Sequence, residues 1–205
     1  MKIQGYYGHT IIGTLWFNLP LGIVLCFLFQ NIIKKPFIEN SPNFIQYRVT
    51  ELKNLNWKKY FMDNWIVVCL SILIGAYSHI FWDSFTHSNT FFTNYFGLDR
   101  KVFNTEIPIF KLLQHVSTLI GGILILWYFL KLKKDKIEYT KPSIKYWINI
   151  GFFAISIMGI RIAFGLKIIE YGNVIVSAIA AGMIAITLAS LYEKIKTGSN
   201  NVYKA

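Results

Sequence analysis

Charged residues are scarce in this sequence, and acidic residues are the scarcest. Only 15% of the 205 residues are charged, with 10 acidic against 21 basic residues, while 54% are hydrophobic. Soluble domains average about 25% charged residues, so this balance excludes an ordinary soluble protein. It is typical of a chain whose apolar surface faces lipid, and it predicts that the lipid bilayer is a partner of the protein.

Cysteine and sequence repeats are also lacking. The chain has 2 cysteines, Cys26 and Cys69, and both lie inside apolar runs. This placement excludes a disulfide framework and predicts thiols buried in the membrane. No internal repeat is visible, although many transporters are built from one. Transport is therefore a weaker hypothesis than chemistry at a fixed site.

Long apolar runs are what the sequence does contain. Because about 20 apolar residues cross a bilayer, these runs predict an all-α fold, a polytopic membrane helical bundle with about five transmembrane helices. We expect one membrane-embedded domain over residues 1–196, followed by a polar tail over 197–205. Pro20 should kink or locally open the first span. The predicted spans are residues 10–33, 65–85, 112–130, 146–166 and 173–191.

The positive charge predicts an orientation and no nucleic-acid partner. A net charge of +11 would suggest nucleic acid in a soluble protein, but here the basic residues cluster between apolar runs. Residues 34–63 and 131–145 and the C-terminal tail are basic, whereas the loop after residue 85 is balanced. Basic loops stay in the cytoplasm, so the N-terminus should lie outside and the C-terminus inside.

Small residues recur along the fifth predicted span. Ser177, Ala181, Ala185 and Ala189 are spaced every fourth residue. On a helix they form one face, and small side chains allow two membrane helices to approach closely. We therefore expect this face to pack against another helix.

A polar stripe ends the second predicted span. His79, Asp83 and His87 are spaced at i, i+4 and i+8, so on an α-helix they lie along one face. An imidazole and a carboxylate one turn apart can converge on one divalent cation. Such ligands suit zinc or manganese. Polar residues at membrane depth are costly and usually functional, which makes this stripe the leading candidate site.

The remaining histidines fall at the same predicted membrane face. His9 directly precedes the first span and His115 lies near the start of the third, so both are further candidate metal ligands. Arg161, near the end of the fourth span, is placed to contact a substrate phosphate. Simpler explanations stay open: His9 and His115 as ordinary helix-end residues, and Asp83 with Arg161 as a structural ion pair.

These polar segments resemble a known membrane family. The segments Gly8-His9-Thr10, residues 78–87 and Lys111-Leu112-Leu113-Gln114-His115 together resemble the bacterial multi-pass membrane family catalogued as domain of unknown function 4184. The element His79-x-x-x-Asp83 is also similar to one in inner-membrane proteins described as metal-dependent hydrolases and, more distantly, in zinc phospholipase C. The resemblance implies a metal hydrolase in the bacterial cytoplasmic membrane.

Two functional hypotheses follow. In the first, the protein is a membrane-bound hydrolase of a lipid-linked or envelope phosphoester at the extracytoplasmic face. A divalent metal, with zinc preferred, is held by His79, Asp83, His87, His115 and His9, and it activates water. Asp83, His87 and Arg161 are the candidate catalytic residues. In the second hypothesis, the protein is a non-catalytic membrane protein that binds a metal or a partner. The sequence leaves its oligomeric state open.

Overall fold

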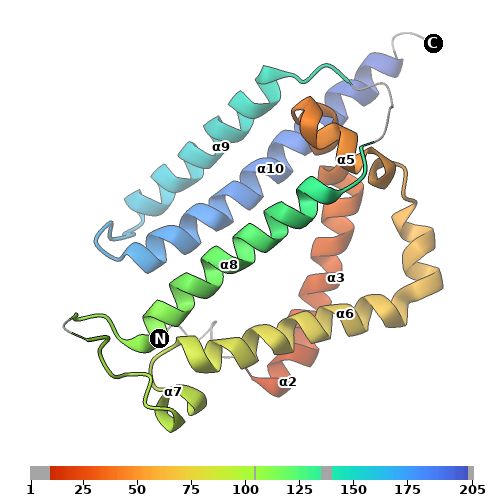
Figure 1. Ribbon diagram of the computed structural model, residues 1–205. Coiled ribbons are helices and arrows are strands. Elements are labelled where there is room, and N and C mark those ends of the chain that lie inside the picture. Colours follow the sequence, from red (N-terminus) through yellow and green to blue (C-terminus); the bar gives the residue numbers. More distant parts are fainter. Residues whose placement is uncertain (1–9, 104, 135–139, 203–205) are drawn as a thin grey trace. The chain divides into compact units, whose positions relative to one another are not determined.

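The computed structural model describes residues 10–103, 105–134 and 140–202, and this part of the chain is helical. Figure 1 shows the helices in chain order. Apart from one isolated bridge between Lys101 and Pro108, the described residues form no β-structure. The helices are α2 (Ile11–Gly13), the π-helical turn η1 (Thr14–Asn18), α3 (Leu19–Leu28), the π-helical turn η2 (Phe29–Ile33), α4 (Lys34–Asn40), α5 (Asn43–Lys53), α6 (Trp57–Thr86), α7 (Phe91–Tyr95), α8 (Ile109–Lys131), α9 (Ile144–Ala163) and α10 (Tyr171–Val202).

Five helical segments are long and apolar enough to cross a membrane, which confirms the predicted fold class. They are Thr14–Asn40, Trp57–Tyr95, Ile109–Lys131, Ile144–Ala163 and Tyr171–Thr197. Their large side chains point outward: Ile74, Ile125 and Ile155 are 68%, 73% and 75% exposed. So much apolar surface would be unfavourable in water and is compatible with lipid.

The helix bounds differ from the predicted spans for local reasons. The second span begins earlier, at Trp57, and is kinked at Asn64, where φ is −133° and ψ is 27°. The Asn64 side chain donates to the carbonyl oxygen of Tyr60 at 3.1 Å, which competes with regular helical bonding there. The last helix continues to Val202, through most of the expected polar tail.

The chain forms two compact units, each made of separate stretches of sequence. Unit 1 comprises Met1–Val24 and Lys58–Leu132, and unit 2 comprises Leu25–Trp57 and Lys133–Ala205. Unit 1 therefore holds most of α6 together with α7 and α8. Unit 2 holds η2, α4, α5, α9 and α10.

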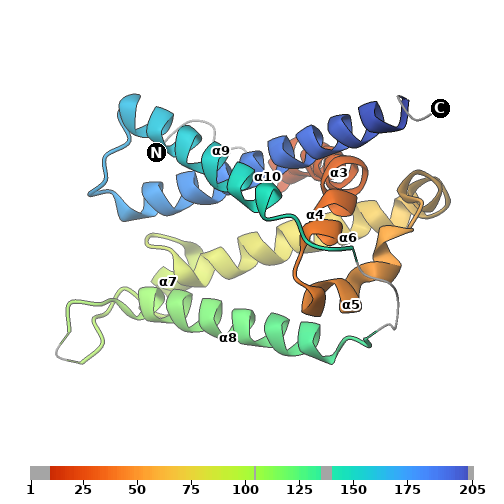
Figure 2. The ribbon, with the colours of Figure 1, turned by 90° about the horizontal axis from the view of Figure 1, so that it is seen from above.

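The centre of unit 2 is the pairing of α9 with α10, which lie side by side in Figures 1 and 2. Ala181, Ala185 and Ala189 are at most 1% exposed and Ser177 is 9% exposed, which confirms the predicted small-residue packing face. The hydroxyls of Tyr146 and Ser190, both fully buried, lie 2.8 Å apart and join the two helices.

Buried polar groups connect the loops of unit 2. The Gln46 amide of α5 donates to the carbonyl oxygens of Ser41 and Thr140 at 2.8 and 2.9 Å and accepts from the Thr140 N–H at 3.1 Å. Nearby, Trp147 Nε1 donates to the carbonyl oxygen of Asn40 at 2.7 Å. These bonds fasten the segment before α9 to the α4–α5 connection.

Candidate functional site

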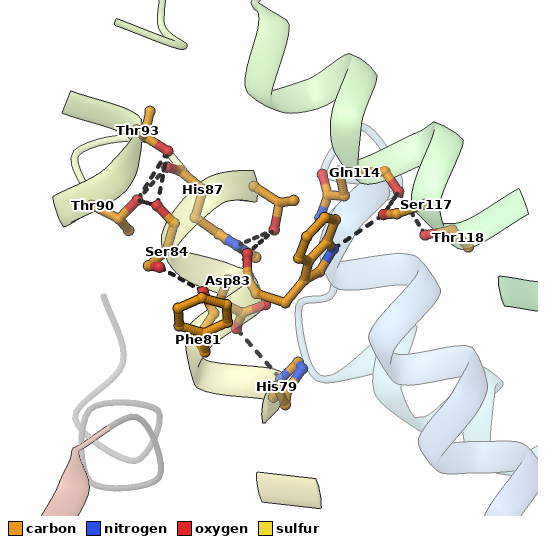
Figure 3. A network of polar contacts seen from close by, with 12 residues as sticks. His79, Phe81, Asp83, Ser84, His87, Thr90, Thr93, Gln114, Ser117 and Thr118 are labelled. Carbon is orange, nitrogen blue, oxygen red and sulfur yellow. Dashed lines mark hydrogen bonds and ion pairs between the residues drawn. The ribbon is translucent and has the colours of Figure 1, made fainter. Parts of the chain in front are cut away.

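The C-terminal end of α6 carries the predicted polar stripe, within unit 1. Asp83 is half-buried, and its two carboxylate oxygens face different histidines (Figure 3). Oδ2 lies 3.4 Å from His79 Nε2, and Oδ1 lies 3.6 Å from His87 Nδ1. Both pairs are spaced i,i+4, as the sequence predicted. One carboxylate therefore sits between two imidazoles on a single helix face.

The exposure of the three side chains differs. The side chain of Asp83 is 16% exposed, whereas those of His79 and His87 are 67% and 50% exposed. The carboxylate is therefore shielded by the end of α6, while both rings stay accessible. Thr86, almost fully buried beside them, places its hydroxyl 3.4 Å from His87 Nδ1. His87 thus has two oxygen neighbours at one ring nitrogen.

The short helix α7 folds against the end of α6 and holds it in place. The Ser84 carbonyl oxygen lies 2.7 Å from the Thr90 hydroxyl and 3.2 Å from the buried Thr93 hydroxyl. Phe85 of α6 stacks on Phe92 of α7 with ring centroids 4.4 Å apart. Asn89 makes the reversal possible with a φ of 58°, a left-handed conformation that asparagine tolerates.

The start of α8 is bonded to the same region of α6. Trp82 Nε1 donates to Ser117 Oγ at 3.2 Å, and Ser117 Oγ donates to the Gln114 carbonyl oxygen at 3.1 Å. This brings the α8 segment containing His115 to the α6 end that carries Asp83.

Sequence reasoning did not identify the residues that support this site. Thr90 directly precedes α7, a position where threonine is a helix-start signal, so it was recognisable in principle. The bond from Trp82 to Ser117 joins residues 35 apart, and no spacing rule predicts it.

The proposed metal set is only partly assembled. Within residues 10–103, 105–134 and 140–202, no group of three His, Cys, Asp or Glu side chains is arranged to hold a metal ion. His115 is exposed on α8, and His9 lies outside the described residues. Arg161, exposed near the end of α9, belongs to unit 2. The roles of these three residues, including an Asp83–Arg161 ion pair, stay predictions.

One pair of donor atoms nevertheless has a separation that suits two ligands of a divalent cation. Two ligands bound about 2.0–2.1 Å from a tetrahedral zinc ion lie roughly 3.3–3.4 Å from each other. The separation of 3.4 Å between His79 Nε2 and Asp83 Oδ2 matches two corners of such a site. His87 faces the other carboxylate oxygen. In metal sites, a group that contacts the second oxygen of a carboxylate ligand holds that ligand in its orientation.

Comparison with known proteins identifies a family but no activity. A family model described as domain of unknown function (DUF4184) matches residues 1–191, which include all the candidate site residues. No curated protein and no solved structure matches the chain.

Proposed function

The chain belongs to the family of the domain of unknown function (DUF4184), and we propose that it is a membrane-bound, metal-dependent hydrolase of a lipid-linked or envelope phosphoester. The observation that carries the proposal is the half-buried Asp83 carboxylate, held between His79 and His87 at the end of a membrane span. A carboxylate in this setting is costly unless it is paired or binds a cation.

His79 Nε2 and Asp83 Oδ2 are the primary ligands in this proposal, because their separation suits one ion. His87 orients Asp83 through its other oxygen, and His115 and His9 complete the set. A divalent cation, with zinc preferred, supplies a Lewis acid that activates water and neutralises a phosphoryl oxygen. Arg161 stabilises negative charge on the phosphoryl group.

A lipid-linked substrate is supported by the position of the cluster. The cluster lies at the end of α6, one of the five candidate membrane spans, and the proposal puts this end beside the lipid headgroups. Aromatic rings surround this end, and the most exposed, Phe91 and Tyr95 on α7, are 71% and 74% exposed. Aromatic residues favour the boundary between lipid and water. A phosphate on a membrane lipid would therefore reach His79 without leaving the bilayer surface.

The test is metal content with matched variants. Purified protein is loaded with zinc or manganese, passed over a desalting column and measured by elemental analysis. We expect about one ion per chain in the unchanged protein and at least a tenfold weaker affinity in His79→Ala and Asp83→Asn, because removing one ligand or its charge weakens the site. Asp99→Asn, an exposed residue on the following loop, is the control and should retain the metal.

Hydrolysis is measured separately as phosphate release from phosphoester lipids in detergent. Asp83→Asn should lose activity while still inserting and purifying, and excess metal should partly restore it. If Asp83 instead only pairs with Arg161, Asp83→Asn leaves the Arg161 charge without a partner and lowers the melting temperature. Lower stability, together with background metal in both forms, would reject the hydrolase. Bound metal without hydrolysis of any phosphoester would favour the non-catalytic alternative.

A further inference from the structure

A small polar cavity lies between α9 and α10, within unit 2, and the proposed hydrolase does not use it. It is lined by Lys145, Ile148 and Asn149 of α9 and by Tyr192, Glu193 and Lys196 of α10. Its volume is about 240 Å³. Sites for drug-sized ligands measure about 300–1,000 Å³, so this cavity suits a smaller polar group. The lining residues lie where α9 begins and where the span Tyr171–Thr197 ends, so the cavity is at the ends of two candidate spans.

The cavity is lined by charges of both signs that do not pair with one another. Glu193 and Lys196 are one turn apart on α10, and Lys145 is on the neighbouring helix. All the ion pairs found among the described residues lie elsewhere, so the two ammonium groups and the carboxylate are not neutralised by each other. Opposite charges that border a cavity instead of closing an ion pair favour a ligand that carries both signs.

The burial of the acidic and amide residues distinguishes this cavity from an ordinary lysine-rich surface. Glu193 and Asn149 are half-buried, and in the described part of the chain no side-chain hydrogen bond is formed by either. Half-buried polar groups without a protein partner are satisfied by water or by a ligand. Lysine side chains at the end of a membrane helix commonly extend toward water, which explains two exposed lysines. It does not explain why a half-buried carboxylate and amide line the same cavity.

We propose that this cavity binds the headgroup of phosphatidylethanolamine, a lipid with an anionic phosphate and a primary ammonium group. The phosphate accepts from Lys145 and Lys196, and the ammonium group donates to the Glu193 carboxylate. A primary ammonium has three N–H donors, whereas the quaternary ammonium of phosphatidylcholine has none. Phosphatidylglycerol has no positive charge for Glu193, so its binding is disfavoured. Free phosphoethanolamine has the same charged groups, but the position at the ends of two spans favours the lipid.

The experiment is native mass spectrometry of the full chain. Protein is reconstituted in nanodiscs with equal amounts of phosphatidylethanolamine, phosphatidylcholine and phosphatidylglycerol, extracted in mild detergent and separated from free lipid. We expect one retained phosphatidylethanolamine per chain, with a preference of roughly tenfold over phosphatidylcholine, the effect of one hydrogen bond to a charged group. Glycerophosphoethanolamine, which has the same headgroup and no acyl chains, should displace the lipid only at a far higher concentration.

Variants of the cavity separate the roles of the two charges. Glu193→Gln keeps the size of the side chain and should remove the preference for phosphatidylethanolamine over phosphatidylcholine. Lys145→Met combined with Lys196→Met should lower the retention of all three lipids, because each of them carries a phosphate. Glu193→Lys should shift the preference to phosphatidylglycerol, a gain that a misfolded protein would not show. Size-exclusion profiles establish that each variant is folded.

Two matched controls remove the same charges away from the cavity. Lys167→Met and Glu170→Gln lie in the connection between α9 and α10, and both should retain lipid like the unchanged protein. The proposal is overturned if the unchanged protein retains no lipid or retains the three lipids equally. A preference that survives Glu193→Gln would also overturn it, since the ammonium group would then bind elsewhere. Displacement by glycerophosphoethanolamine at the concentration of the lipid itself would assign the cavity to a soluble ligand instead.

Discussion

Hydroxyl groups within the spans mostly bond to the backbone of their own helix. Ser71 Oγ donates to the Val67 carbonyl oxygen at 2.7 Å, and Thr187 Oγ1 donates to the Met183 carbonyl oxygen at 2.8 Å. This arrangement satisfies a polar group in lipid without a partner helix. The contact between Tyr146 and Ser190 is different because it joins two helices through fully buried hydroxyls.

We predict that removing both hydroxyls of this contact destabilises the protein little more than removing one of them. Tyr146→Phe leaves the Ser190 hydroxyl buried without its partner and should lower the free energy of unfolding by about 0.6–2 kcal/mol. Adding Ser190→Ala should cost little more, because both partners are then apolar. Unfolding of the two single variants and the double variant in detergent gives the coupling energy. Strictly additive losses would show that the two hydroxyls do not interact.

At the candidate site, the relative positions of side chains on one helix were predictable from the sequence. The relative positions of side chains on different helices were not. The i,i+4 rule places His79 and His87 beside Asp83, and both pairs are found there. Whether His115 faces the same point depends on the rotation of α8 about its own axis. That rotation is influenced by contacts such as the bond from Trp82 to Ser117, which hydropathy does not encode.

At the scale of the helix, the irregular turns of the first span have a common origin. η1 and η2 end two and three residues before Pro20 and Pro36. Because proline has no N–H, a carbonyl one turn earlier loses its donor, and wider π-helical bonding is one way to accommodate this loss. The sequence predicted a local opening at Pro20, but not the second opening ahead of Pro36. Nor did it predict the kink at Asn64, because asparagine is compatible with a regular helix.

Gly22 gives the clearest prediction for helix packing within unit 1. A Cβ added there would lie 2.8 Å from Cγ2 of Ile72 on α6, closer than carbon atoms normally approach. Gly22→Leu should therefore overpack this contact and destabilise the protein by about 1–3 kcal/mol. Gly151→Leu on α9 should be tolerated, because a Cβ there meets nothing within 4 Å. Thermal unfolding in detergent compares the two.

A compensating substitution distinguishes this contact from a general effect of leucine. Ile72→Ala removes the methyl group that blocks position 22, so the pair Gly22→Leu with Ile72→Ala should recover most of the lost stability. If Ile72→Ala only adds to the damage, the α3–α6 contact at Gly22 is not the cause. Gly22→Ala should cost less than leucine, since only one side-chain methyl group of Ile72 has to move.

For the whole molecule, the number of spans was predictable and their grouping was not. Five apolar runs correspond to five candidate spans, and the spacing of Ala181, Ala185 and Ala189 correctly marked a packing face. Hydropathy does not say which helix fills that face. The two units mix early and late segments of the chain, and long-range bonds such as that between Gln46 and Thr140, 94 residues apart, hold unit 2 together.

The distribution of lysine along the chain predicts how the chain crosses the membrane. Residues 34–63 and 131–145 are rich in lysine, whereas the loop after α6 balances Arg100 and Lys101 against Asp99 and Glu106. Because lysine-rich loops remain in the cytoplasm, we expect Asn94, exposed on α7, to lie outside and Lys134 inside. In a chain with Cys26 and Cys69 replaced by alanine, Asn94→Cys should react with a membrane-impermeant maleimide in intact cells. Lys134→Cys should react only after permeabilisation. The reverse result would invert the orientation and move His79, Asp83 and His87 to the cytoplasmic face, where an envelope phosphoester would be out of reach.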